Sequence, residues 1–528
     1  MPSNAPLGAN DQHREHNRDR FAAHTAAWRS SRRAMFNRAA VGLGATALGS
    51  ILAPKLSSAA LPALLNGDQA ATPNGGHATT LNGGHAADGP TYRLPGEAPA
   101  KNVIFLFMAG APSQVDLFDP KPGLRDRFAE PLPPTISGGQ RVTAMTRGKA
   151  QLIAPSRYRF NSHGDCGMQL SELLPHIGSV ADDLCLIRSM TTNAINHDPG
   201  KTFLCTGAEI PGRASMGSWL SYGLGSINRD LPDFVVLNSA FWTGGKGNVQ
   251  ALYSRLWGSG PLPSRHQGVK FQTAGDPVLF LSNPDGVPSS VRRRMLDTLA
   301  AANAHHHDVV GDPEIETTIA AQEMAFRMQS SVPELTDLSG EPSASMRAYG
   351  PEVEKTGSFA RNCLLARRMV ERGVRFVQLF HRGWDHHSTL PTKLPGQCYD
   401  VDQPVAALIR DLKSRGLLDS TMIVMAGEFG RTVYCQGTLN DQTYGRDHHP
   451  RCFSVLMAGG GIRGGHVHGK TDDFSYNVVE NPVRVADLHA TMLHQLGVDH
   501  ERLVFPFQGL DQKLTGVEPA SVVRDIIG

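Results

Sequence analysis

Three short segments in the C-terminal third of the chain each combine carboxylate and imidazole or guanidinium side chains. They are Gly383–Ser388 (Gly-Trp-Asp-His-His-Ser), Gly427–Thr432 (Gly-Glu-Phe-Gly-Arg-Thr) and Gly445–Pro450 (Gly-Arg-Asp-His-His-Pro). Carboxylate oxygens mixed with imidazole nitrogens are the ligands of zinc and other divalent transition ions, whereas magnesium and calcium prefer oxygen alone. The segments therefore predict a shared metal site, provided that the fold brings them together.

Neighbouring histidines in these segments are not expected to bind the same ion, because successive side chains in extended backbone point in opposite directions. We expect His386 and His449 to face the substrate instead, or to support a ligand. Arg431 and Lys201 are candidates for binding an anionic ester oxygen, since guanidinium and ammonium groups suit such oxygens. A surface ion pair is the alternative for each of these two cations.

Four apolar runs have the length of a strand, and the last three of them border these segments. The runs are 102–108, 374–380, 421–426 and 452–457, and helical patterns lie at 359–372 and 404–415. The second helix is expected to begin at Pro404, and Gly373 and Gly416 follow the two helices. Alternating strands and helices predict an α/β fold, a doubly wound, mostly parallel sheet with helices on both faces. Ligands of such sheets bind beyond the carboxyl ends of the strands, where the polar segments stand.

The middle of the chain has a different composition. Residues 225–345 are rich in Gly, Pro and Ser and contain one helical pattern, at 314–329. This range is interpreted as an insertion over the active face, or a cap. The run at 305–307, three histidines, is expected to be a solvated helix end.

The N-terminus reads as an export signal rather than as part of the fold. Arg32-Arg33 precedes a mild apolar run at 39–53, which is shorter than the roughly 20 residues that cross a bilayer. With the small residues after it, this pattern over 1–60 resembles a twin-arginine signal; an amphipathic or disordered leader is the alternative. Residues 61–98, with a repeated Asn-Gly-Gly-His-Ala, predict a flexible linker. The expected location is the periplasm or the exterior, with no membrane span in the mature form.

Bulk composition excludes some partners. The 528 residues include 51 basic and 49 acidic side chains, a formal charge of +2, so no nucleic-acid partner is expected. The seven cysteines form no Cys-x-x-Cys pair, which argues against a thiolate zinc site and predicts mostly buried free thiols. The number of histidines, 22, is the unusual feature of the composition.

The chain resembles the DUF1501 family, a family of proteins of unknown function. The motifs that carry the resemblance are Phe105–Pro122 (which opens Phe-Leu-Phe-Met-Ala-Gly-Ala-Pro-Ser), the three polar segments above, and Asp487–Gly497. The resemblance covers roughly residues 100–528. It implies the alkaline-phosphatase-like (sulfatase-like) fold over 99–528 and a two-metal site for phosphate or sulfate esters.

The usual metal ligands of the superfamily can be matched to positions in this sequence. The ligand set that the resemblance implies departs from the superfamily pattern in places. Asp385 with His387 stands in the place of an Asp…His pair, though at shorter spacing, and His448 in that of the last metal histidine. Glu428 replaces an Asp, and Phe429 beside it cannot bind metal. A ligand Asp usually follows the first strand; here Ala109-Gly110 stand there, and Asp116 is the nearest carboxylate.

The nucleophile is the weakest part of the implied site. In relatives it lies about nine residues before a Thr-Gly pair, which corresponds here to His197 before Thr206-Gly207. His197 could act as nucleophile, general acid/base or extra ligand, and Ser113 is the second candidate. No Cys-x-Pro-x-Arg signature is present, so sulfatase formylglycine chemistry is not expected.

Together these patterns predict an exported hydrolase that uses one or two divalent ions, zinc by preference, on a small-molecule or polysaccharide ester. The alternative is a non-catalytic cell-envelope or binding protein of the same fold, in which the metal serves stability.

Overall fold

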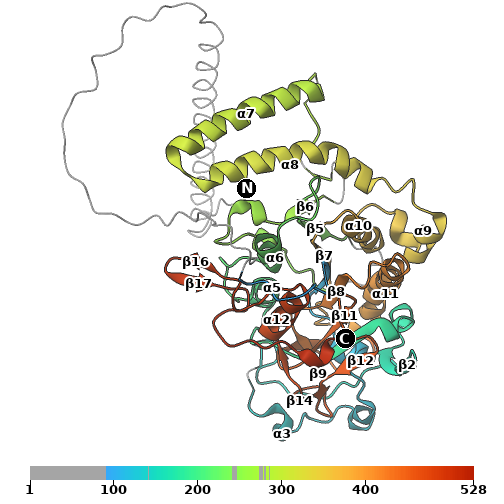
Figure 1. The fold of residues 1–528 in the computed structure, drawn as a ribbon. Coiled ribbons are helices and arrows are strands. Elements are labelled where there is room, and N and C mark those ends of the chain that lie inside the picture. Colours follow the sequence, from blue (N-terminus) through green and yellow to red (C-terminus); the bar gives the residue numbers. More distant parts are fainter. Residues whose placement is uncertain (1–90, 141, 241–246, 273–276, 279–280, 285) are drawn as a thin grey trace, which may run out of the picture. The chain divides into compact units, whose positions relative to one another are not determined.

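The computed structural model describes residues 91–140, 142–240, 247–272, 277–278, 281–284 and 286–528 (Figure 1). The expected signal at 1–60 and residues 61–90 of the expected linker lie outside these ranges. Among the described residues, no helix combines the length and apolarity that a membrane span requires.

A nine-stranded sheet organises the described part of the chain. Its order is β12-β4-β11-β8-β1-β7-β5-β6, with β15 beside β4. The strands are β1 (Asn102–Ala109), β4 (Leu184–Thr191), β5 (Phe234–Asn238), β6 (Val269–Phe271), β7 (Phe376–Arg382), β8 (Thr421–Ala426), β11 (Phe453–Ala458), β12 (His466–His468) and β15 (Val483–Arg484). Every pairing in it is parallel except those of β11, which runs antiparallel to β4 and β8.

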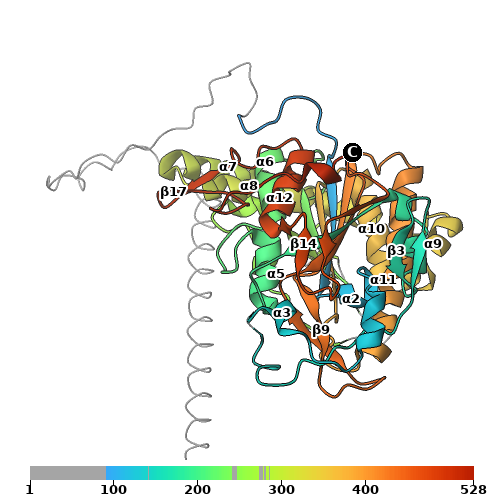
Figure 2. The same ribbon diagram turned by 90° about the horizontal axis from the view of Figure 1, so that it is seen from below.

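The central strand β1 is buried on both faces, as its unbroken apolar run predicts. Ile104 and Leu106 belong to one core and Phe105 and Phe107 to the other, because alternate side chains point to opposite faces. The first core is completed by α10 (Phe359–Glu371) and α11 (Leu390–Ser414), the second by α6 (Met216–Leu224) and α12 (Val485–Gln495). Figure 2 shows these two helix layers with the sheet between them. The expected α/β architecture is confirmed.

The reversed direction of β11 determines where the polar segments meet. The segments after β7 and β8 leave the carboxyl ends of parallel strands. The segment 445–450 precedes β11, whose antiparallel direction puts its start at that same edge of the sheet. All three segments therefore reach one edge.

The predicted strands and the helix at 359–372 agree with the structure to within two residues. The helix expected to begin at Pro404 begins at Leu390, so this boundary was wrong: Pro404 lies inside α11. Pro391 occupies the first turn, where a missing N–H costs nothing. Buried Val401 and Val405, on either side of Pro404, hold the helix through it despite the lost hydrogen bond.

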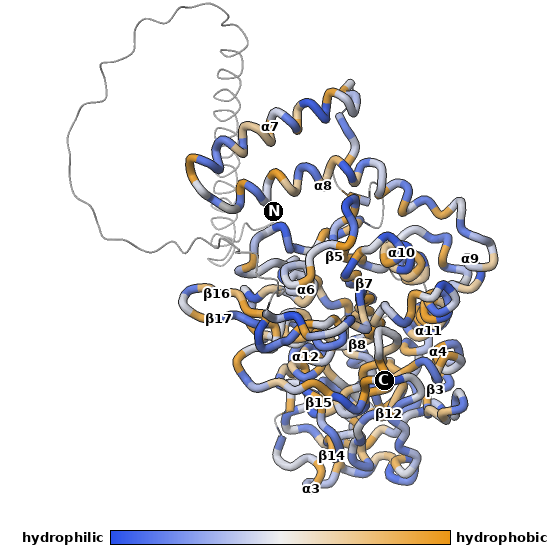
Figure 3. Tube along the Cα trace, in the orientation of Figure 1, coloured by the Kyte–Doolittle hydropathy of each residue, from blue (hydrophilic) through white to orange (hydrophobic). Residues whose placement is uncertain are grey.

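The range 225–345 contains a helical hairpin, α7 (Ser289–Val310) and α8 (Pro313–Thr336), which lie side by side in Figure 1. Both helices alternate hydrophilic and hydrophobic residues in Figure 3. Leu296 is the one buried residue of α7 in the described structure. The histidines at 305–307 stand in the last turns of this helix, and His305 and His306 are exposed, as predicted. α8 contacts the short helix η4 (Ser264–His266) and α10.

Candidate metal centre

Four elements bring the candidate side chains together. Asp385 and His387 follow β7, and His197 opens the helix α5 (His197–Thr206). His448 lies on β10 (Gly445–His449), which pairs antiparallel with β9 (Gly430–Gln436) so that His448 faces Arg431 in register.

The centre of this site is one carboxylate oxygen, Oδ1 of Asp385. The Nε2 atoms of His387, His197 and His448 lie 2.8, 3.2 and 3.5 Å from it. One ligand atom from each of these four residues lies within 4.8 Å of the others. His387 is half-buried and the other three are buried.

Each imidazole is fixed through its other nitrogen. Nδ1 of His197 lies 2.6 Å from Oε1 of Glu428, and Nδ1 of His387 lies 2.5 Å from Oε1 of Gln436. Nδ1 of His448 lies 2.8 Å from the carbonyl oxygen of Ile195. Carboxylate, amide and carbonyl oxygens accept here, so each Nδ1 carries a proton, and in the neutral form of each ring the Nε2 lone pair faces Asp385. This is how metal-binding histidines are held in proteins.

Three lone pairs that face a carboxylate repel it unless a cation lies among them. The Nε2 atoms of His197 and His448 are buried and have no hydrogen-bond partner. Ligands of a tetrahedral zinc ion stand about 3.3 Å apart, given metal–ligand bonds of roughly 2.0–2.1 Å. The observed nitrogen–oxygen distances fall around that value, so these four residues fit a divalent ion.

Burial by itself would raise the pKa of Asp385. The neighbouring imidazoles of His197, His387 and His448 and the charge of Arg431 outweigh it and hold the pKa far below its usual range. Burial lowers the pKa of His448 to about 4. For His197, burial lowers the pKa, but the two carboxylates beside it raise the pKa overall, so a proton competes with a metal ion for Nε2 of this ring. The carboxylate is thus ionised, as a metal ligand requires.

Glu428 stands behind His197 instead of among the four clustered ligands. Its two carboxylate oxygens accept the backbone N–H of Gly110 at 3.0 and 3.1 Å, and Oε1 also contacts His197. Burial would raise the pKa of Glu428, but the hydrogen bond from His197 lowers it overall. An anionic Glu428 therefore orients the His197 ring.

Asp116, the other expected ligand, is occupied by a different partner. Arg446 donates to both of its oxygens, at 2.7 and 3.1 Å, and both side chains are fully buried. Ser113 donates its hydroxyl to Asp116 at 2.6 Å, and it is buried as well. The structure therefore joins Asp116 and Ser113 to each other and not to the histidine cluster.

The four expected substrate-binding residues are all buried. His449 donates Nε2–H to the carbonyl of Tyr476 at 2.6 Å, and His386 lies against Gly247. Lys201 donates to the carbonyl of Ala251, and burial lowers its pKa. Of the four, Arg431 contacts a ligand of the cluster directly: its Nη2 lies 2.7 Å from Oδ1 of Asp385.

Several supporting groups carried no sequence signal. Gln250, within the expected insertion, donates to Oδ2 of Asp385 at 2.9 Å, and Asn248 forms a bridge with Asp385. Part of the range 225–345 thus lines the metal centre. Gln436 could have been suspected from its place on the strand that leads away from Arg431, whereas the Ile195 carbonyl, like any backbone oxygen, has no sequence signal.

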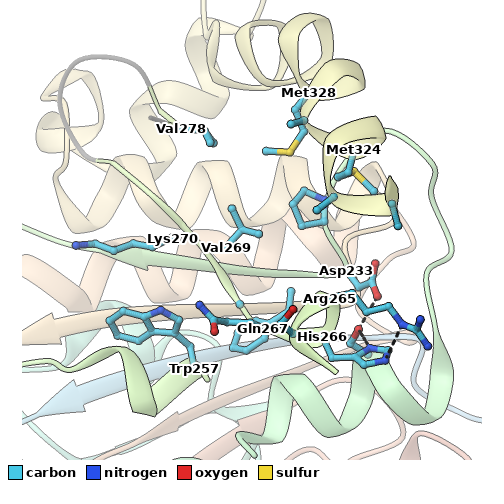
Figure 4. Close-up of a pocket in the computed structure, with 18 of the residues that line it drawn as sticks. Asp233, Trp257, Arg265, His266, Gln267, Val269, Lys270, Val278, Met324 and Met328 are labelled. Carbon is cyan, nitrogen blue, oxygen red and sulfur yellow. Dashed lines mark hydrogen bonds between the residues drawn. The ribbon is translucent and has the colours of Figure 1, made fainter. Parts of the chain in front are cut away.

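A separate cavity lies away from the metal centre. It has a volume of about 750 Å³, and its lining includes the polar residues of η4 and apolar side chains such as Trp257, Val269 of β6, and Met324 and Met328 of α8 (Figure 4). Ser221, which also lines it, donates to Asp233 at 2.7 Å and contacts His266 at 2.8 Å. Asp233 directly precedes β5, so this cavity adjoins the amino end of that strand, and the metal centre lies at the carboxyl ends.

Comparisons with known proteins give a family and distant structural neighbours. Residues 100–527 match the family model described as "Protein of unknown function (DUF1501)". No curated protein matches the sequence at a significant level.

The structural neighbours are distant. The PsFucS1 sulfatase from Pseudoalteromonas sp. is 13% identical with a TM-score of 0.32, and the match covers 77% of this chain and 69% of the sulfatase chain. The alkaline phosphatase from the Antarctic bacterium TAB5 is 9% identical with a TM-score of 0.28, covering 75% and 98%. The lipoteichoic acid synthase LtaP from Listeria monocytogenes is 10% identical with a TM-score of 0.31, covering 81% and 77%. Since these scores are low, the site is assigned from this chain's own geometry.

Proposed function

For this chain, which belongs to the DUF1501 family of proteins of unknown function, we propose the role of an exported, metal-dependent hydrolase of phosphate or sulfate esters. The observation that carries the proposal is the convergence of three imidazole Nε2 atoms on Oδ1 of Asp385. Three imidazole nitrogens and a carboxylate oxygen within coordination reach of one another suit a divalent ion, and these mixed nitrogen and oxygen donors favour zinc.

His197, Asp385, His387 and His448 would hold the ion. A bound zinc ion would polarise an ester oxygen and lower the pKa of a coordinated water. The protein's own part is to fix the ligands: Glu428, Gln436 and the Ile195 carbonyl retain the Nδ1 protons. These contacts keep each ring in the tautomer that binds metal.

The alternative function has one observation in its favour. Ser113, a candidate nucleophile, donates its hydroxyl to Asp116. In His197, the other candidate, Nδ1 contacts Glu428 and Nε2 faces Asp385. With these groups engaged, the attacking group in a hydrolase would be water. A non-catalytic protein that keeps the metal for stability would show the same contacts.

Metal content and turnover separate the two functions. The full chain would be loaded with zinc, its metal measured by mass spectrometry, and its activity assayed with p-nitrophenyl phosphate and p-nitrophenyl sulfate. We expect bound zinc and turnover of one ester, both lost on His387→Ala and retained on His306→Ala, a change on exposed α7. Bound zinc without turnover on either ester would support the non-catalytic role, and absence of metal would refute both.

Export is part of the proposal and rests on Arg32-Arg33 and the apolar run at 39–53. Replacing Arg32 and Arg33 with Lys should trap the protein inside the cell, because twin-arginine export depends on that pair. Cell fractionation measures this. An unchanged exported fraction would contradict the twin-arginine route but would not contradict the proposed metal centre.

A further inference from the structure

Arg431 is a buried cation whose position does not depend on a metal. Its side chain is 1% exposed. Nε donates to the carbonyl of Ala111 at 3.0 Å, Nη1 to that of Arg446 at 3.1 Å, and Nη2 to that of Gly110. These three carbonyls hold the guanidinium whether or not Asp385 is engaged.

The same guanidinium donates to the oxygen on which the histidines converge. Nη2 of Arg431 lies 2.7 Å from Oδ1 of Asp385. A metal ion at the cluster would share this carboxylate with a permanent positive charge. That charge repels any second cation that approaches from the side of Gly110 and Ala111.

Among the residues that the structure describes, the nearby carboxylates offer no second set of ligands. Oδ2 of Asp385 accepts from Gln250, and both oxygens of Glu428 accept the N–H of Gly110. Both oxygens of Asp116 accept from Arg446. The Gly110 and Ala111 carbonyls, which could bind a hard cation, already bind Arg431.

We propose that Arg431 is a built-in cation that takes the place of a second metal ion, so that this centre binds one divalent ion per chain. The inference rests on the proposed metal function and specifies its stoichiometry. It also assigns Arg431 a positioning role: it neutralises Asp385 when no metal is bound, and so lets the empty site persist in the folded protein.

Stoichiometry is the primary test. The full chain would be saturated with zinc, freed of excess by gel filtration, and analysed for metal by mass spectrometry and by calorimetric titration. One equivalent of tightly bound zinc is expected. Two equivalents would overturn the inference and leave the metal function standing, whereas no zinc would refute the metal function itself.

The role of the charge is tested by Arg431→Met and Arg431→Lys, with zinc affinity and Tm as readouts. Arg431→Met removes a cation that competes with zinc and leaves Asp385 uncompensated in the metal-free protein. We expect zinc to bind about tenfold more tightly and to raise Tm more than in the wild type. Arg431→Lys keeps the charge and should stay close to the wild type.

Unchanged or weaker zinc binding by a folded Arg431→Met protein would overturn the charge role. If that variant does not fold without zinc but folds when zinc is present, the inference is supported. If the variant folds in neither condition, the inference is accepted or rejected on the zinc stoichiometry of the wild-type protein.

Discussion

The backbone N–H of Gly110 lies within hydrogen-bonding distance of both carboxylate oxygens of Glu428, at 3.0 and 3.1 Å. The first strand therefore ends by donating to a carboxylate from a neighbouring strand end. Glu428, so held, accepts from His197 at 2.6 Å and fixes the ring that points at Asp385. The metal centre thus depends on a glycine whose only functional group is its backbone.

Glu428 should matter for metal affinity without binding metal. Glu428→Ala removes the acceptor for Nδ1 of His197, and zinc affinity is expected to fall about 10- to 100-fold. Glu428→Gln keeps an amide oxygen as acceptor and should lose less. Calorimetric titration measures both, and Glu480→Gln, a change at an exposed residue, is the control. A complete loss of binding in Glu428→Gln would instead make Glu428 a direct ligand.

Gly110 should not tolerate a side chain. Its φ is +114°, and a Cβ there would lie 2.6 Å from the backbone nitrogen of Asp385 and 2.9 Å from that of Trp384. Gly110→Ala is expected to displace Asp385 and to lower both stability and zinc affinity. Gly212→Ala is the matched control, since φ is +109° and no atom lies within 4 Å of the added Cβ. It should cost only about 1 kcal/mol of backbone strain. Equal effects in the two variants would contradict the steric argument.

The fold was readable from the sequence because its strands are buried on both faces. An unbroken apolar run such as 421–426 predicts a central parallel strand, and β8 has these bounds. Pro404 misled the prediction because local rules treat proline as a helix start, while the packing of α11 carries the helix past it. Local pattern therefore located the elements more reliably than it located their ends.

The candidate site was readable only in part, because sequence indicates which residues reach an edge and not how they pair there. Asp385, His387 and His448 were expected near one another, and they cluster with His197. Asp116 carried the same chemical signal, but a buried arginine from β10 lies beside it. Such a pairing joins residues over 300 positions apart, and nothing in their local sequences records it.

Asp116 should contribute to stability and not to metal binding. Asp116→Asn leaves the charge of Arg446 uncompensated in a buried site, which is expected to cost about 3 kcal/mol of unfolding free energy. Urea denaturation measures that loss, and mass spectrometry should find the zinc content unchanged. Asp126→Asn, at an exposed position of the 3-10 helix η1 (Pro122–Arg127), is the control and should alter neither quantity. Loss of zinc from a folded Asp116→Asn protein would restore Asp116 as a ligand.

His489 should make stability depend on pH. It is fully buried on α12, donates Nε2–H to the carbonyl of Leu204 at 2.9 Å, and burial lowers its pKa to about 4. The unfolded chain has a histidine pKa near 6.5, so between about pH 6.5 and 4 the unfolded state binds the extra proton. Stability is therefore complete above pH 6.5 and falls as the pH drops through this window, by at most about 1.4 kcal/mol per pH unit for this residue.

His489→Gln keeps a side-chain donor but cannot titrate, so it isolates this contribution. Urea unfolding of both proteins between pH 5 and about 8, with metal removed by chelation, compares their slopes and not their absolute stabilities. Below pH 6.5, the slope of the unfolding free energy against pH should be smaller in the variant by an amount that corresponds to about one proton. Above pH 6.5, the slopes of the two proteins should match. Every other buried histidine titrates equally in the two proteins, so indistinguishable slopes would mean that His489 is already protonated in the folded state.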